Sequence, residues 1–159
     1  MDKALSRRGE EQQKINFAVH TKQANIESRA LEIVEYYKEH KPCTFGQALC
    51  QCMRITKVTV ETLSARTGFP VRKIGRLRND ETEDIEFGTI IALCVALNLA
   101  PATAESLLSL KRYTLNCDEP YTQICRMFLE EKNVSVEACN KILKSFGFEP
   151  LTNGEILAA

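Results

Sequence analysis

Residues 59–79, TVETLSARTGFPVRKIGRLRN, are the stretch that decides the fold. Thr59 is a residue type that caps the N-terminus of a helix, and Gly68 is the type that ends a helix in the left-handed conformation. After this glycine, Ile74 and Leu77 lie three residues apart and give a second helix one apolar stripe. The stretch therefore predicts two short helices joined by a tight turn.

The second of these helices is strongly basic on the side away from its apolar stripe. Pro70 fits its first turn, because a proline needs no backbone hydrogen-bond donor there. Arg72, Lys73 and Arg76 would then face outward as a contact surface. The alternative is that these charges only solubilise a helix used for packing.

Charge is unevenly distributed along a chain whose formal net charge is zero, with 21 basic and 21 acidic residues among 159. Residues 80–86 hold five carboxylates and no cation, and residues 117–159 have a net charge of −3. Between residues 54 and 79, Glu61 alone opposes seven cations: Arg54, Lys57, Arg66, Arg72, Lys73, Arg76 and Arg78. A basic segment flanked by acidic ones is the electrostatic footprint that binding in a nucleic-acid groove requires. A single run of this kind is also compatible with a solvated charged face.

Helical periodicity of the apolar residues extends over most of the chain, and no strand-like alternation is present. Residues 1–24 are polar and aperiodic and are expected to form a flexible arm. An amphipathic helix containing Leu31 and Val34 follows and ends before Pro42. Further helices are expected at residues 45–55, 60–67, 70–79, 86–99, 101–113, 121–132 and 136–146. The chain is therefore predicted to be all-α.

Buried faces can be assigned to three of these helices. The helix at 45–55, which Thr44 can cap, places Phe45, Leu49 and Cys52 on one face. The helix at 121–132 has an apolar face of Ile124, Phe128 and Leu129. The helix at 136–146, which begins after Ser135, has an apolar face of Cys139, Ile142, Leu143 and Phe146.

The helix expected at 86–99 is apolar nearly all round. Its apolar residues include Ile90, Ile91, Ala92, Leu93, Cys94, Val95 and Leu97. Such a helix needs cover on both sides. We expect residues 117–150 to pack back on it, or the helix to lie in a dimer interface.

Residues 45–99 resemble, without a gap, the λ-repressor/Cro-like (XRE-type) family of helix-turn-helix domains. The residues that carry the resemblance are Phe45, Gly46, Leu49, Cys52, Val58, Thr59, Leu63, Ser64, Gly68, Phe69, Ile74, Leu77, Asn79 and the ALNL of residues 96–99. The resemblance implies a five-helix domain over residues 42–115. An N-terminal arm and amphipathic helix would precede it at residues 1–41. A C-terminal helical pair at residues 116–159 would serve packing or dimerisation.

In this family the second helix of the motif enters the major groove of DNA, while the first lies across the phosphates. The resemblance therefore implies base contacts from Val71, Arg72, Lys73 and Arg76. It implies phosphate contacts from Lys57, Thr59, Arg78 and Asn79, with Arg54 as a further candidate. The helical scaffold beneath them would consist of Leu63, Ser64, Gly68, Phe69, Ile74 and Leu77. Arginine can bond bidentately to guanine, and valine can contact a thymine methyl group.

Three residues depart from the family pattern. Val60 stands where many members carry a glutamine, and Pro70 replaces a serine that usually caps the second helix. Gly75 lies in mid-helix, where it costs about 1 kcal/mol relative to alanine. It either permits close approach to the DNA backbone or only loosens the helix. These departures concern which bases are recognised more than whether DNA is bound.

The sequence thus indicates a sequence-specific, double-stranded-DNA-binding transcriptional regulator, expected to act as a repressor and a homodimer. The alternative is an antitoxin or adaptor module that mainly binds a partner protein, with the C-terminal helices as the binding surface. The domain together with the C-terminal segment FLEEKNVSVEACNKILKSFGFEPLT, residues 128–152, is also similar to small regulators of Gram-positive bacteria.

Other classes of function receive little support from the sequence. The longest apolar run, residues 89–100, is too short to cross a bilayer, and the N-terminus has no stretch of signal-peptide type. A cytoplasmic protein with reduced thiols is expected, because seven cysteines is an odd number and most lie in apolar helical patterns. No membrane partner is expected.

The cysteines and histidines are the residues from which a metal site or a catalytic site would be expected. His40, Cys43, Cys50 and Cys52 lack the usual spacing of zinc ligands, so no metal is expected. The histidines have no nucleophile pattern beside them, and neither catalysis nor a cofactor is expected. Cys117 and Cys125 are candidates for oxidant sensing, although buried or idle thiols are the simpler interpretation.

Overall fold

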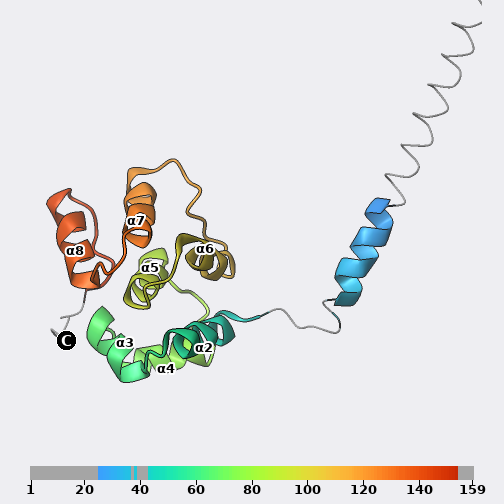
Figure 1. Cartoon of the computed structure of the whole chain (residues 1–159), viewed down its shortest axis with the longest axis horizontal. Coiled ribbons are helices and arrows are strands. Elements are labelled where there is room, and N and C mark those ends of the chain that lie inside the picture. The colour runs from blue at the N-terminus through green and yellow to red at the C-terminus, as the bar shows by residue number, and fades with distance from the viewer. Residues whose placement is uncertain (1–24, 37, 39–42, 154–159) are drawn as a thin grey trace, which may run out of the picture. The chain divides into compact units, whose positions relative to one another are not determined.

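The computed structural model describes residues 25–36, 38 and 43–153, which are drawn in colour in Figure 1. The chain divides into two compact units, Met1–Pro42 and Cys43–Ala159, and each is described by itself. The predicted arm at residues 1–24 and both histidines lie outside the described residues. The division of the chain into domains at residues 41 and 115 stays a prediction.

In the first unit, residues 25–36 and 38 are helical, as the spacing of the apolar residues predicts. The side chains from residue 25 to residue 36 are all exposed. The large apolar ones are Ile26, Leu31, Ile33, Val34 and Tyr36. The apolar side of this helix is therefore accessible along its described length.

The second unit is built from helices alone in the part of the chain between residues 43 and 153. They are α2 (Phe45–Thr56), α3 (Val60–Thr67), α4 (Val71–Arg78), α5 (Phe87–Ala96), α6 (Pro101–Ser109), α7 (Pro120–Glu130) and α8 (Val136–Ser145). The all-α prediction is confirmed. Nowhere in the described ranges does a helix reach the length and apolar character needed to cross a membrane.

α5 is the centre of the second unit. Every residue from Thr89 to Ala96 is buried. α3, α6, α7 and α8 all pack against it, and Figure 1 shows α5 in the middle of these helices. The two C-terminal helices, α7 and α8, thus bury part of the surface of a helix that is apolar all round. This confirms the prediction that residues 117–150 pack back on it.

The predicted helix caps agree with the structure at several positions. The Thr44 hydroxyl accepts a hydrogen bond from the Gln47 amide, and the Gln47 side chain accepts one from the Thr44 amide, so that α2 begins with a capping box. Ser135 caps α8 through the amide of Ala138. Pro101 occupies the first turn of α6, where its missing donor costs nothing.

The predicted buried faces of α2 and α8 are wrong in part. Cys52 is half-buried, and Met53 is the residue of that turn that enters the core. Ile142 is 37% exposed and Phe146 is 70% exposed. α8 packs against α3 and α5. Its buried residues are Val136, Cys139, Asn140 and Leu143, and Phe146 lies beyond its last turn. The contact face is therefore narrower than the apolar pattern suggests.

Candidate nucleic-acid interface

The turn between α3 and α4 is held by its own hydrogen bonds. Gly68 has φ 80° and ψ 0°, and its amide donates to the Ser64 carbonyl at 2.9 Å. The Ser64 hydroxyl donates to the Phe69 carbonyl at 2.6 Å. The Thr67 hydroxyl donates to the Leu63 carbonyl at 2.8 Å and accepts from the Phe69 amide at 3.1 Å. These bonds fix the direction in which α4 leaves the turn.

The residues predicted as the scaffold of this turn lie in or against the core. Leu63, Phe69, Ile74 and Leu77 are buried, with exposed fractions between 0 and 6%. Ser64 and Gly68 are half-buried. Burial of one side of α4 leaves its opposite side facing solvent.

Pro70 is the N-cap of α4 and not a residue of its first turn, which corrects the sequence-based prediction by one position. Its φ of −58° and ψ of 146° are extended, and the Ile74 amide donates to its carbonyl at 3.2 Å. No side chain caps this end of α4. The amides of the first turn are therefore available to an external acceptor such as a phosphate oxygen.

The four residues predicted to contact bases, Val71, Arg72, Lys73 and Arg76, are all exposed on α4. Val71 is 47% exposed. Within the described part of the chain, the side chains of Arg72 and Arg76 make no hydrogen bond or ion pair. Lys73 differs from them, because its ammonium lies 4.2 Å from the centroid of the Phe69 ring. Arg72 and Arg76 are thus the cations of α4 whose side chains have no partner within the described residues.

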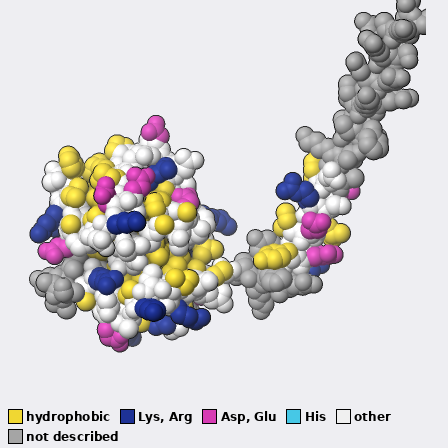
Figure 2. All heavy atoms as spheres, in the orientation of Figure 1, with side chains coloured by type: hydrophobic (Ala, Val, Ile, Leu, Met, Phe, Trp, Pro, Cys, Tyr) yellow, Lys and Arg dark blue, Asp and Glu magenta, His cyan; other side chains and the backbone are white. Residues whose placement is uncertain are grey.

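The residues predicted to contact phosphates are also exposed, and two have defined local roles. Thr59 caps α3 by accepting from the Thr62 amide at 3.2 Å. The Arg78 guanidinium donates through Nε to the Cys50 sulfur at 3.3 Å, which directs it along α2. The remaining three, Lys57, Arg54 and Asn79, are exposed near the ends of α2 and α4. Figure 2 shows Lys and Arg side chains along the lower edge of the second unit, where Figure 1 places α2, α3 and α4.

Arg66 belongs to the basic segment but serves the fold. Its Nη1 donates to the Ala96 carbonyl at 2.8 Å, at the C-terminal end of α5. A cation at this end of a helix interacts favourably with the helix dipole. Arg66 therefore ties the first helix of the motif to the central helix.

Asp80 joins the end of α4 to the start of α2. This role was not predicted from the sequence. Its Oδ1 accepts from the Gly46 amide at 2.7 Å, and its Oδ2 accepts from the Thr44 hydroxyl at 2.7 Å. A Cβ at Gly46 would collide with the Arg78 carbonyl and lie 2.7 Å from Asp80 Oδ2. The glycine thus permits the close approach of the two helices that the carboxylate fastens. The only signal in the sequence was an aspartate directly after the basic helix.

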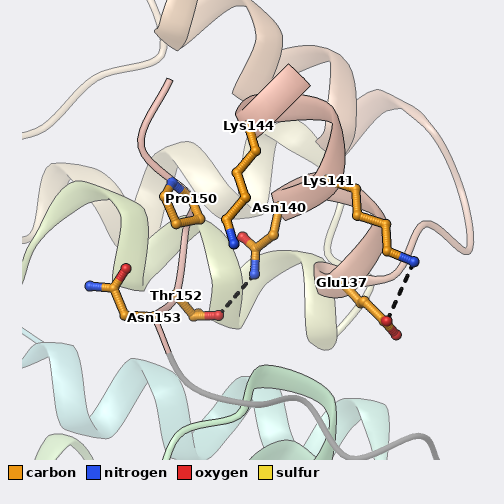
Figure 3. Close-up of a pocket in the computed structure, with 7 residues that line it drawn as sticks. All are labelled: Glu137, Asn140, Lys141, Lys144, Pro150, Thr152 and Asn153. Atoms are coloured by element: carbon orange, nitrogen blue, oxygen red, sulfur yellow. Dashed lines mark hydrogen bonds and ion pairs between the residues drawn. The ribbon is translucent and has the colours of Figure 1, made fainter. Parts of the chain in front are cut away.

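A cavity in the second unit lies away from α4, between α8 and the segment that follows it (Figure 3). It has a volume of about 440 Å³ and is lined by Glu137, Asn140, Lys141, Lys144, Pro150, Thr152 and Asn153. Asn140 donates through Nδ2 to the Thr152 hydroxyl at 3.0 Å, and its Oδ1 accepts from the Leu151 amide at 2.8 Å. Lys141 points outward to pair with Glu137 at 3.6 Å. The polar groups of this cavity therefore fasten the C-terminal segment to α8.

The cysteines show no metal-binding arrangement in the described ranges. No group of three or more His, Cys, Asp or Glu side chains there could hold a metal ion. Cys43 is exposed and Cys50 and Cys52 are half-buried, while His40 lies outside the described residues. Cys125 is fully buried, and this burial raises the pKa of its thiol to about 12. Its thiolate is therefore scarce at neutral pH, which argues against the oxidant-sensing role considered for it.

Comparison with known proteins gives one match. Residues 48–107 match the family model of the Cro/C1-type HTH DNA-binding domain, and this range contains α3, α4 and α5. Neither the curated proteins nor the solved structures contain a match to the chain. The matched range includes all of the exposed α4 residues described above.

Proposed function

Because residues 48–107 match the family model of the Cro/C1-type HTH DNA-binding domain, we propose that this protein is a sequence-specific, double-stranded-DNA-binding transcriptional regulator. The observation that carries the proposal is the state of Arg72 and Arg76. Both are exposed on α4, and the side chain of neither makes a hydrogen bond or ion pair with another described residue. An arginine without an intramolecular partner can use its whole guanidinium for a partner outside the chain.

In this proposal α4 enters the major groove, and α3 lies across the sugar–phosphate backbone. Arg72 and Arg76 bond bidentately to guanine O6 and N7, and Val71 contacts a thymine methyl group. Lys73 reaches the bases only if its ammonium gives up its contact with the Phe69 ring, so it contributes less to DNA affinity than the arginines do.

The phosphates would be held by groups that surround α4. Lys57, Arg78 and Arg54 provide charge, and Thr59 and Asn79 provide neutral donors. The uncapped amides at the start of α4 add a positive helix end. Phosphate contacts set the register of the protein on the duplex, and the base contacts of α4 distinguish one sequence from another.

We further propose that the protein acts in the cytoplasm as a homodimer that represses by occupying its operator. A two-fold dimer would place two copies of α4 in successive major grooves about 34–36 Å apart, and the operator would be a palindrome. Analytical ultracentrifugation of the full chain, alone and with operator duplex, measures the stoichiometry. Binding of a single copy to a non-palindromic site would contradict the dimer.

A second candidate is an antitoxin or adaptor role in which the C-terminal helices bind a partner protein. The observation that favours it is the exposure of large apolar side chains on this part of the unit. Phe146 is 70% exposed, Met127 43% and Ile142 37%. Substitution of Phe146 and Ile142 by serine would abolish such binding and leave DNA affinity unchanged.

Selection of duplexes from a random pool by the full chain tests the proposed function. We expect one enriched motif, and a loss of affinity as salt concentration rises. On the selected duplex, Arg72→Ala and Arg76→Ala are each expected to cost about 1–3 kcal/mol and to relax preference at one or two base positions. Lys141→Ala on α8 is the control and should bind as the wild type does. Recovery of no motif, or unchanged affinity in both arginine variants, would contradict the proposal.

A further inference from the structure

The glycines that lie within described helices differ in what surrounds them. A Cβ at Gly46 would collide with the Arg78 carbonyl, and a Cβ at Gly88 would lie 3.3 Å from the Leu151 carbonyl. Apart from its chain neighbours and the nearby backbone of α4 itself, Gly75 has no atom within 4 Å of the position that its Cβ would take. Gly75 is also absent from the described glycines with positive φ, which are Gly68 and Gly147. Nothing in the described fold therefore requires a glycine at position 75.

Gly75 is nevertheless an unfavourable residue for its place. It is the fifth residue of the eight in α4, where glycine is less favourable than alanine because of its greater backbone entropy in the unfolded chain. Alanine would fit the helix without a clash. The described fold therefore gives no reason for a glycine at this position.

The position of Gly75 on α4 shows where a reason outside the described fold would act. It follows Val71 by four residues and Arg72 by three, and it precedes Asn79 by four, so it shares the outer side of the helix with them. All three of these neighbours are exposed, and Gly75 itself is half-buried. The buried residues of α4, Ile74 and Leu77, lie on the other side.

We propose that Gly75 is the point at which the backbone of α4 comes closest to the base pairs, and that it sets how deeply the helix enters the major groove. This inference rests on the proposed function. A glycine allows a backbone to approach a ligand more closely than any other residue does. Deep entry brings the guanidinium groups of Arg72 and Arg76 to the base edges on either side of it, where bidentate bonds require a short distance.

Substitution of Gly75 by alanine separates this role from a structural one. In the free protein, Gly75→Ala should shift the unfolding equilibrium toward the native state by about fivefold, because it removes the helix penalty of glycine. On the selected duplex the same variant should lose at least tenfold in affinity. Gly75→Leu should lose more, because a larger side chain holds the helix farther from the bases. Urea denaturation and fluorescence anisotropy measure the two quantities.

Thr103→Ala is the matched control, since it also increases helix propensity at an exposed position but lies on α6. It should leave DNA affinity unchanged. If Gly75→Ala binds the duplex as the wild type does while Arg72→Ala and Arg76→Ala lose affinity, the inference is overturned and the proposed function stands. If all three variants bind as the wild type does, both are overturned. A loss of stability in Gly75→Ala would reveal an intramolecular reason for the glycine and would also overturn the inference.

Discussion

Asp80 is the residue on which the position of α4 most depends. Its carboxylate accepts from the Thr44 hydroxyl and the Gly46 amide, and it thereby fastens the end of α4 to the first turn of α2. Asp80→Ala should lower the free energy of unfolding by about 1–3 kcal/mol, because it leaves the Gly46 amide without its charged acceptor. Urea denaturation checks this value.

Glu81→Ala serves as the control for this substitution, since it removes a neighbouring carboxylate that makes no side-chain hydrogen bond or ion pair within the described residues. Its effect should stay within about 0.5 kcal/mol. Equal losses in the two variants would show that the charge of this segment matters and not the hydrogen bonds of Asp80.

Buried thiols give the free energy of unfolding a dependence on pH. Burial raises the pKa of Cys125 and of Cys139 from 9.0 to about 12, and it also raises the pKa of Cys94. These thiols ionise more readily in the unfolded chain. Their contribution to stability is therefore complete below about pH 9 and is lost as the pH rises from about 9 toward 12.

Urea denaturation in reducing buffer between pH 7 and pH 10.5 checks this dependence. We expect the free energy of unfolding to fall above pH 9, and to fall less steeply in Cys125→Ala. Alkylation at pH 8 should label the exposed Cys43 before Cys94, Cys125 or Cys139. Rapid labelling of Cys125 in the native protein would contradict its burial.

At the residue scale, caps and turns could be predicted from the sequence, and long-range hydrogen bonds could not. Thr44, Thr59, Gly68 and Ser135 act through neighbours within a few residues, so their residue type alone indicates their role. Asp80 acts on Thr44, 36 residues away. Its role depends on the packing of α4 against α2, which no local pattern contains.

At the scale of elements, α8 shows how packing narrows an apolar face. Leu143 is fully buried between α8 and its neighbours, whereas Phe146 follows the last turn and is 70% exposed. Leu143→Ala should cost about 2–5 kcal/mol of stability, while Phe146→Ala should change it by no more than about 0.5 kcal/mol. Thermal and urea unfolding of the two variants provide the comparison. A large loss in Phe146→Ala would mean that this ring packs against the unit in solution.

The buried residues of α3 and α4 were easier to predict than those of α8. The apolar stripes of α3 and α4 are short, and capping residues mark where these helices begin and end. Ile74 and Leu77 are the buried residues of α4, as their spacing predicts. α5 was recognisable because it is apolar on every side. In α8, four apolar positions qualified for burial, and only its packing against α3 and α5 decides between them.

At the scale of the whole molecule, the second unit separates the proposed DNA-binding surface from the elements that hold it in place. The family match covers residues 48–107, yet α7 and α8 lie beyond it and still pack against α5. From the apolar character of α5, the sequence predicted either this cover or a dimer interface. The C-terminal helices thus stabilise the domain whose α4 is proposed to bind DNA, and their outer side remains accessible.

The most direct test of the proposed interface is a map of the amide chemical shifts of the full-length, ¹⁵N-labelled chain as the selected duplex is added. We predict that the largest changes fall on residues 57–62 and 71–79, at the start of α3 and along α4. Residues of α8 should change little. Changes confined to α7 and α8, with the amides of Arg72 and Arg76 unaffected, would contradict the account.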